Sequence, residues 1–266
     1  MTEFDSEHQV RGIDRKEIDI TQLEQCQAQI DQFRPDTIIN AAALTDVDYC
    51  ETHEDEALRV NGYGAGNLSK AAASAGGLLV HYSTDYVFDG SKKEAYVEED
   101  TPNPQSVYGR SKLLGEDLVR KHCPNHLIIR ISWLFGRNGS NFIRTIVDAA
   151  KKGKPLRVVN DQKGSPTYAK DAASHTVRMV CSGCRSLYHL TNSGICTWYE
   201  LAVKSVKWAR VEDVQIMPVS TREFPRPALR PANSTLANAH LERDGLGSMR
   251  PWQSAVREYI QQYLVC

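Results

Sequence analysis

The amino-acid sequence predicts an α/β protein built on a doubly wound parallel sheet, with a smaller second lobe interleaved at its C-terminal end. Three short apolar runs predict the strands, because buried parallel strands are β-rich and lack polar alternation; they cover residues 37–40, 78–84 and 127–132. Helical patterns occupy residues 21–33, 54–75 and 107–122. A strand–helix–strand order gives a right-handed parallel sheet with helices on both faces.

The element boundaries carry their own signals. The stretch "TQLE" at residues 21–24 is a capping box, in which Thr21 and Glu24 satisfy free backbone N–H groups and start a helix. After about residue 135, proline and glycine become frequent, as in "SPT", "FPRPALRP" and "MRPW". Since no flexible linker composition separates the two parts, we expect the second lobe to be interleaved with the first.

Composition narrows the function. The chain has 266 residues, 41% of them hydrophobic, and a net charge of −1, with no basic stripe or polybasic tail. These features argue against binding to nucleic acid or to a membrane surface, and no apolar run approaches the roughly 20 residues of a membrane span. The seven cysteines show no disulfide spacing, so we expect reduced thiols and a cytoplasmic protein.

All three predicted strands end in unusual residues. "NAAALTDVDYCE" follows the first strand, "STDYVFDG" closes the second, and "SWLFGRNGSNF" follows the third. Because parallel α/β sheets bind ligands beyond the carboxyl ends of their strands, these residues predict a cleft at one edge of the sheet.

A tyrosine and a lysine share one face of the helix that follows the second strand. Tyr108 and Lys112 lie four positions apart in "SVYGRSKLLGE", and either Ser83 or Thr84 ends the preceding strand. A nearby ammonium is expected to lower the pKa of a phenol, which is near 10 when unperturbed. A hydroxyl could bind a substrate oxygen while Tyr108 donates a proton to it. This set of groups fits the reduction of a ketone.

A series of motifs in order resembles the extended short-chain dehydrogenase/reductases and, within them, the dTDP-4-dehydrorhamnose reductases. The motifs span most of the chain and read "NAAALTDVDYCE", "VNGYGAGNLSKAA", "HYSTDYVFDG", "VYGRSKLLGE", "RISWLFG", "NFIRT", "VVNDQKGSPTY", "YHLTNSGICTWYELA" and "FPRPALRPANSTL". The resemblance implies a Rossmann-like fold and NAD(P)H-dependent reduction of dTDP-4-dehydro-6-deoxy-L-mannose to dTDP-L-rhamnose, a step of polysaccharide biosynthesis. Residues 1–135 would then form an incomplete dinucleotide-binding domain, to which a segment near 156–192 returns, and 136–266 would mainly bind substrate.

The resemblance also implies roles for individual residues. The catalytic group would be Tyr108, Lys112 and Thr84. Contacts to the cofactor would come from Asp19, Ile20, Ala41, Ala42, Ala43, Tyr82, Tyr108 and Lys112. Contacts to the sugar nucleotide would come from Thr84, Asp85, Trp133, Asn141 and Arg230. A turn-forming role for Asn141 and a surface salt bridge for Arg230 remain open alternatives, and His81 is expected to be a core residue.

The chain departs from this family pattern at its beginning. The family opens with a strand and a glycine-rich turn that hold the pyrophosphate of the cofactor. Here "MTEFDSEHQVRGID" resembles the end of the first helix followed by the second strand, ending at Asp14. A start site called too far downstream, a gene fragment or a truncated relative would explain this. We expect poor folding of the chain alone and weak binding of a dinucleotide.

Several expectations stay open at this point. Asp14 would favour NADH and the neighbouring Arg15 would favour NADPH. Some relatives depend on a metal, so Mg²⁺ is an expectation by resemblance only, and a homodimer is one assembly that the resemblance allows. The rival interpretation is a non-catalytic regulatory subunit similar to the β subunit of methionine adenosyltransferase, or an inactive fragment.

Overall fold

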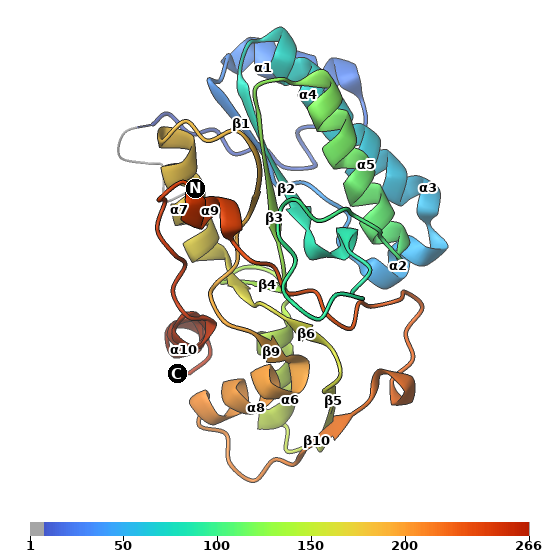
Figure 1. The fold of residues 1–266 in the computed structure, drawn as a ribbon, viewed down its shortest axis with the longest axis vertical. Coiled ribbons are helices and arrows are strands. Elements are labelled where there is room, and N and C mark those ends of the chain that lie inside the picture. The colour runs from blue at the N-terminus through green and yellow to red at the C-terminus, as the bar shows by residue number, and fades with distance from the viewer. Residues whose placement is uncertain (1–7, 266) are drawn as a thin grey trace.

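The computed structural model describes residues 8–265 and confirms the doubly wound α/β class. A parallel sheet in the order β1-β2-β3-β8 forms the upper part of the molecule (Figure 1). Its strands are β1 (Thr37–Asn40), β2 (Leu78–Thr84), β3 (His126–Ile131) and β8 (Ser186–His189). The first two match their predicted bounds, and β3 lies one residue earlier than predicted.

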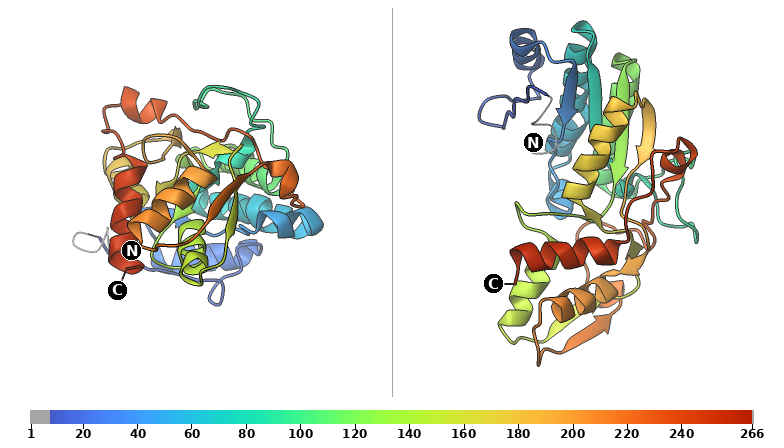
Figure 2. Two further views of the ribbon diagram at one scale, coloured as in Figure 1. Left: turned by 90° about the horizontal axis from the view of Figure 1, so that it is seen from below. Right: turned by 90° about the vertical axis from the view of Figure 1, so that its left-hand side faces the viewer.

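Helices cover both faces of this sheet. Alternate strand residues point to opposite faces, so an unbroken apolar run is buried on both. Leu79 and Ile128 pack against α4 (Ala65–Ser74) and α5 (Val107–His122). Val80 and Ile129 face the opposite way and pack against α7 (Ala169–Cys181). The right-hand view of Figure 2 shows this helix, in yellow, in front of the sheet. The helix α1 (Leu23–Phe33) lies outside the sheet, against α4.

The second lobe lies below the sheet (Figure 1). Its main helices and strands are α6 (Phe142–Lys151), α8 (Trp198–Trp208), α10 (Trp252–Tyr263), β5 (Leu156–Val159) and β10 (Ile216–Val219), with β5 and β10 parallel. Its core gathers aromatic residues from distant parts of the chain, including Phe135, Tyr168, Trp252 and Tyr259. Within the segment 156–192, α7 and β8 return to the upper sheet while β5 pairs in the second lobe.

Shorter elements complete the described chain. They are α2 (Val47–Thr52), α3 (Glu54–Ala57), the π-helical η1 (Leu58–Gly64), the 3-10 turns η2 (Asp85–Val87) and η3 (Thr221–Glu223), α9 (Ala239–Arg243), and the two-residue strands β4 (Leu134–Phe135), β6 (Lys163–Gly164), β7 (Thr167–Tyr168) and β9 (Cys196–Thr197). The helix predicted at 54–75 is therefore a run of three segments, α3, η1 and α4. Among residues 8–265, no helix is both long enough and apolar enough to cross a lipid bilayer.

Two local predictions are wrong. No strand ends at Asp14, because residues 8–14 are exposed, pair with no strand of the described chain and so lack a hydrogen-bonding ladder; the remainder of that prediction, at residues 1–7, lies outside the described residues. The capping box at Thr21 does not form either. The helix begins at Leu23, and the Thr21 N–H donates to Asp19 Oδ1 at 2.9 Å, so Asp19 closes the turn instead.

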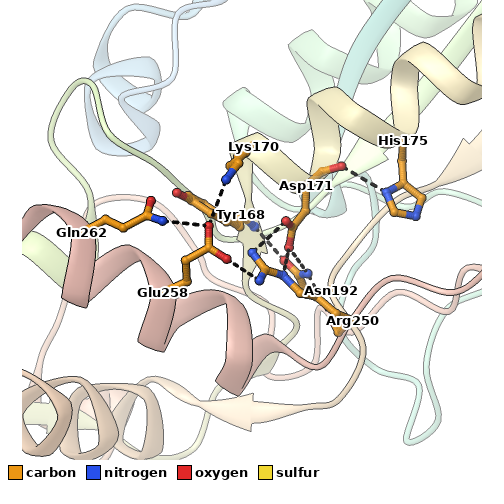
Figure 3. Close-up of polar contacts among 8 residues, drawn as sticks. All are labelled: Tyr168, Lys170, Asp171, His175, Asn192, Arg250, Glu258 and Gln262. Carbon is orange, nitrogen blue, oxygen red and sulfur yellow. Dashed lines mark hydrogen bonds and ion pairs between the residues drawn. The ribbon is translucent and has the colours of Figure 1, made fainter. Parts of the chain in front are cut away.

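A polar network joins the two lobes (Figure 3). The guanidinium of Arg250 donates to both carboxylate oxygens of Asp171 on α7, at 2.7 and 2.9 Å, and to Glu258 on α10 at 2.5 Å. Lys170 pairs with the same Glu258 at 3.1 Å, and Asn192 donates to Asp171 at 2.7 Å. Because α7 covers the upper sheet and α10 belongs to the lower core, these bonds set the relative position of the lobes.

Candidate active site

The end of β2 and the first turns of α5 meet at the carboxyl edge of the sheet. Ser106 caps α5 by accepting a hydrogen bond from the Gly109 N–H at 3.1 Å, which starts the helix just before Tyr108. A Cβ at Gly109 would overlap the Tyr86 carbonyl, so only glycine lets the helix approach so closely. As a result the Tyr108 phenol lies close to the hydroxyl of Thr84.

Lys112 lies one turn further along α5 and is buried. Its ammonium donates a hydrogen bond of 2.6 Å to the backbone carbonyl of Tyr82 on β2. Burial lowers the pKa of Lys112 to about 8, and the Glu116 carboxylate opposes this change. A lysine offers three N–H donors, and this bond uses one of them.

The pKa of Tyr108 differs from the expectation. We expected Lys112 to lower it, but burial of the phenol raises it above its usual value. The nearby Thr84 hydroxyl lowers the pKa in part, while the charge of Asp85 raises it further. The phenol is therefore protonated at neutral pH, which is the form that can donate a proton.

Asp85 adds a buried carboxylate next to this group. Its Oδ1 accepts a hydrogen bond from the Thr84 hydroxyl at 3.0 Å. Burial raises the pKa of Asp85 to about 6, so the carboxylate carries its charge at neutral pH at an energetic cost. The sequence-predicted residues Thr84, Asp85, Tyr108 and Lys112 thus gather in one place.

The turn after β1 is tied to the same helix. Asn61 clamps the backbone of Leu44 through bonds of 2.7 and 3.0 Å and also donates to Ser111 on α5 at 2.9 Å. This leaves Ala41 and Ala42 exposed and Ala43 partly exposed, a small-residue surface that a flat ligand can approach.

The other expected cofactor contacts lie in different settings. Ile20 packs against Gly64, and its carbonyl accepts a hydrogen bond from Asn67 at 3.1 Å, so Asp19 and Ile20 sit beside α4. The Tyr82 hydroxyl bonds Thr176 on α7 at 2.7 Å, so its side chain points to the sheet face opposite α5. His81 is buried and bonds Asn40 at 3.0 Å, as expected of a core residue.

The expected sugar-nucleotide contacts divide into three cases. Trp133 has a φ of 46° and stacks on Trp198 with 3.5 Å between ring centroids, so its indole is held in a defined place. Asn141 caps α6 and also donates to Gly136 and to Tyr259, which favours the structural alternative for this residue. Arg230 pairs with Asp48 at 2.7 Å. Burial raises the pKa of Tyr86, while the charge of Arg230 lowers it and the charge of Asp48 raises it. The Tyr86 ring lies 5.6 Å from the Tyr108 ring, between centroids.

Sequence reasoning missed an ion pair behind the site. Glu116 on α5 and Arg130 on β3 are both buried and form two hydrogen bonds, at 2.8 and 2.7 Å. The available signal was that Glu116 lies two turns beyond Tyr108, on the same helix face.

One group of three potential metal ligands occurs in the described part of the chain. It consists of Glu98, Glu99 and His240. The Nε2 atom of His240 already hydrogen-bonds Glu99, and Mg²⁺ prefers oxygen ligands, so we do not assign the expected Mg²⁺ to it.

A parallel α/β sheet with a hydroxyl, a tyrosine and a lysine at its carboxyl edge defines the class of the short-chain dehydrogenases/reductases. Comparisons with known proteins give the family. The protein-family model described as "RmlD substrate binding domain" matches residues 1–265 of this chain. The chain therefore belongs to this family of NAD(P)-dependent dTDP-sugar reductases.

Individual relatives are similar to this chain over most of their own length. The spore coat polysaccharide biosynthesis protein SpsK of Bacillus subtilis is 39% identical over 255 residues, which is 96% of this chain and 89% of the relative. A crystal structure of a dTDP-4-dehydrorhamnose reductase from Clostridium acetobutylicum has a TM-score of 0.95 and 39% identity, covering 97% of this chain and 91% of that one. The enzyme of that name from Bacillus anthracis, in complex with NADP, has a TM-score of 0.92 and 37% identity, with 94% and 89% covered.

Proposed function

We propose that this protein reduces the C4 ketone of dTDP-4-dehydro-6-deoxy-L-mannose to dTDP-L-rhamnose, with NADPH as its preferred cofactor. The observation that carries the proposal is the meeting of Thr84, Tyr108 and Lys112 at the carboxyl edge of the sheet. The family supports a dTDP-sugar 4-ketoreductase, and the names of the relatives from Clostridium acetobutylicum and Bacillus anthracis support this particular sugar. The Bacillus anthracis complex supports NADP.

Tyr108 and Thr84 would act on the ketone itself, and Lys112 would hold the cofactor. The cofactor supplies a hydride to the C4 carbon when bound. Tyr108 donates its proton to the C4 oxygen, and the raised pKa keeps that proton in place until the oxygen becomes basic. Thr84 hydrogen-bonds the same oxygen and stabilises the negative charge that develops on it.

The residues at the nicotinamide end fit a dinucleotide. Lys112 keeps two N–H donors beyond its bond to Tyr82, and a ribose offers hydroxyl oxygens to accept them. The exposed Ala41 and Ala42 leave room for a flat ring beside the end of β1. We accordingly assign residues 1–135, with the returning α7 and β8, to the cofactor.

The second lobe, mainly within 136–266, would bind the sugar nucleotide. Trp133 presents an indole held on Trp198, a surface suited to stacking on a ring. Arg230 is a candidate partner for the diphosphate, because a guanidinium binds phosphate oxygens bidentately. It would have to exchange its bond with Asp48 for the ligand.

The test is an assay of the purified chain with dTDP-4-dehydro-6-deoxy-L-mannose and NADPH or NADH, following nicotinamide absorbance and identifying the product by NMR. dTDP-4-dehydro-6-deoxy-D-glucose, the epimer at C3 and C5, serves as the competing substrate. We expect dTDP-L-rhamnose as the product and a higher kcat/KM for the L-sugar.

The matched control is Tyr108→Phe, which should lose 10²–10⁴-fold in kcat, about 3–5 kcal/mol, while it still binds the cofactor. A folded wild-type chain that binds NADPH but turns over neither sugar would refute the proposal and favour a regulatory subunit. Preference for the D-sugar would refute the assignment of the substrate alone.

A further inference from the structure

The carboxylate of Glu116 is the centre of a buried cluster behind the candidate site. Arg130 donates to Oε1 at 2.8 Å and to Oε2 at 2.7 Å. The Ser83 hydroxyl donates to Oε1 at 2.6 Å, and Arg120 donates to Oε2 at 2.7 Å. Side-chain exposure is 0% for Glu116 and 1% for Arg130, so a full ion pair lies inside the protein.

The cluster is in register with the candidate catalytic residues. Tyr108, Lys112 and Glu116 repeat every four positions, so they share the face of α5 that meets the sheet. Ser83 immediately precedes Thr84 on β2, and its direct neighbour on β3 is Arg130. Glu116 therefore bonds α5 to two paired strand residues one position before the hydroxyl that contacts Tyr108.

Such a pair is a costly way to gain stability alone. Desolvation of two charges offsets most of their attraction, and well-packed apolar residues often serve as well or better. The cluster does offer direction, because a bidentate guanidinium–carboxylate pair allows only a narrow range of geometries.

We propose that Glu116 is a positioning residue, which fixes the position of α5 along the strands of the sheet through Ser83 and Arg130. It thereby holds Tyr108 next to Thr84 and Lys112 next to the Tyr82 carbonyl. The inference rests on the proposed reductase function for its kinetic consequences. Its geometric and electrostatic consequences can be measured without turnover.

The electrostatic consequence concerns Lys112. Burial lowers the pKa of Lys112, and Glu116 raises it. The other titratable or charged groups around the cluster come from α5, β2, β3 and β8; they are Arg120, His81, Arg130 and His189. Burial lowers the pKa of both histidines below the usual value of 6.5, so neither carries a charge at neutral pH. Without the Glu116 charge, Lys112 would share the cluster with two arginines and lose its proton at lower pH.

The first experiment uses Glu116→Gln in the full chain, which keeps the shape of the side chain but removes its charge. Asp117→Asn is the matched control, because this neighbour is exposed and bonds only Arg120, at 2.9 Å. NMR titration of the lysine side chains should show Lys112 titrating about one pH unit lower in Glu116→Gln and unchanged in the control. In active protein, kcat should fall about tenfold and the alkaline limb of its pH profile should move the same way.

The second experiment applies if Glu116→Gln fails to fold. Replacing the pair with apolar residues, as Glu116→Leu with Arg130→Met, removes both charges of the pair and should preserve folding. We expect this double variant to melt cooperatively, with kcat reduced at least tenfold and the Lys112 titration lowered. A folded double variant with wild-type kcat and an unshifted Lys112 titration would overturn the inference. An inactive wild-type chain in which Glu116→Gln still shifts Lys112 would instead refute only the proposed reaction.

Discussion

The ammonium of Lys112 donates a hydrogen bond of 2.6 Å to the backbone carbonyl of Tyr82. This bond crosses from α5 to β2, two residues before Thr84, and fixes the cation beneath the end of the strand. The ammonium is buried, so its charge is screened little by water. A buried lysine with a lowered pKa is typical of a functional site and is a poor device for stability.

Lys112→Met should therefore separate stability from activity. Burial moves the pKa of Lys112 from 10.5 to about 8, so the charged form costs free energy at neutral pH. The wild type should gain stability as pH rises from about 8 to 10.5, where only the unfolded chain keeps the proton. At pH 7 we expect the variant to be more stable by up to roughly 3 kcal/mol, less the lost bond to Tyr82.

Urea unfolding of both proteins at pH 7 and pH 10 checks this prediction. The advantage of Lys112→Met should shrink at the higher pH, and its turnover and cofactor affinity should be lower at pH 7. A variant that is equally active with the same pH profile would make Lys112 a residue without a catalytic role.

Asp85→Asn should also stabilise the fold. Burial raises the pKa of Asp85 from 3.8 to about 6, so its charge costs free energy above pH 6, and this cost disappears as pH falls to 3.8. At pH 7.5 we expect a gain of up to roughly 3 kcal/mol, with reduced kcat because the Thr84 hydroxyl loses its charged acceptor. Urea unfolding at pH 7.5 and pH 5, with kcat at the higher pH, tests both parts.

Asp89→Asn is the control for the direction of this change in stability. Backbone and side-chain hydrogen bonds from Ser91, and one from Asn103, hold the pKa of Asp89 well below its usual range. Its charged form is thus favoured in the folded state, and removing it should destabilise the protein at pH 7.5. Equal changes in the free energy of unfolding, in the same direction for both variants, would contradict the role of burial at Asp85.

Gly164→Ala should disturb the indole of Trp133. A Cβ at Gly164 would overlap the Trp133 ring, which is stacked on Trp198. If the indole binds the sugar nucleotide, its displacement should raise KM about two- to tenfold, the value of one aromatic contact, with little change in kcat. Steady-state kinetics and tryptophan fluorescence measure the two effects.

Gly136→Ala is a suitable comparison, because its added Cβ would lie 3.0 Å from Ala169 Cβ and near no aromatic ring. Its KM should stay at the wild-type value. A shifted fluorescence spectrum in Gly164→Ala with an unchanged KM would remove Trp133 from the substrate site.

Arg250→Ala should loosen the contact between the lobes. Arg250 bonds Asp171 and Glu258 on two different helices (Figure 3), and its side chain is 34% exposed. Because solvent screens a partly exposed ion pair, we expect a loss of about 1–3 kcal/mol rather than the cost of a fully buried pair. Chemical unfolding measures the loss, and Gln262→Ala, which removes one bond of 3.4 Å to Glu258, should be nearly neutral.

Local patterns predicted much of the fold. The bounds of β1, β2 and α5 match those predicted from two apolar runs and one helical pattern, since these signals lie within the elements themselves. The same reasoning failed at Thr21, where a capping box has the right residue types but Asp19 competes for the turn. It also failed for the strand ending at Asp14, because a strand requires a partner that the segment itself does not contain.

The sequence by itself determined which groups could do chemistry: the spacing of Tyr108 and Lys112 sets their common helix face, and the strand order places Thr84 at the same edge. Only the tertiary structure decided how those groups behave. The raised pKa of Tyr108 comes from burial, and Arg230 pairs with Asp48, 182 residues away. Burial and long-range pairing depend on every segment that packs around a residue, whereas a sequence pattern reports only the residue's near neighbours along the chain.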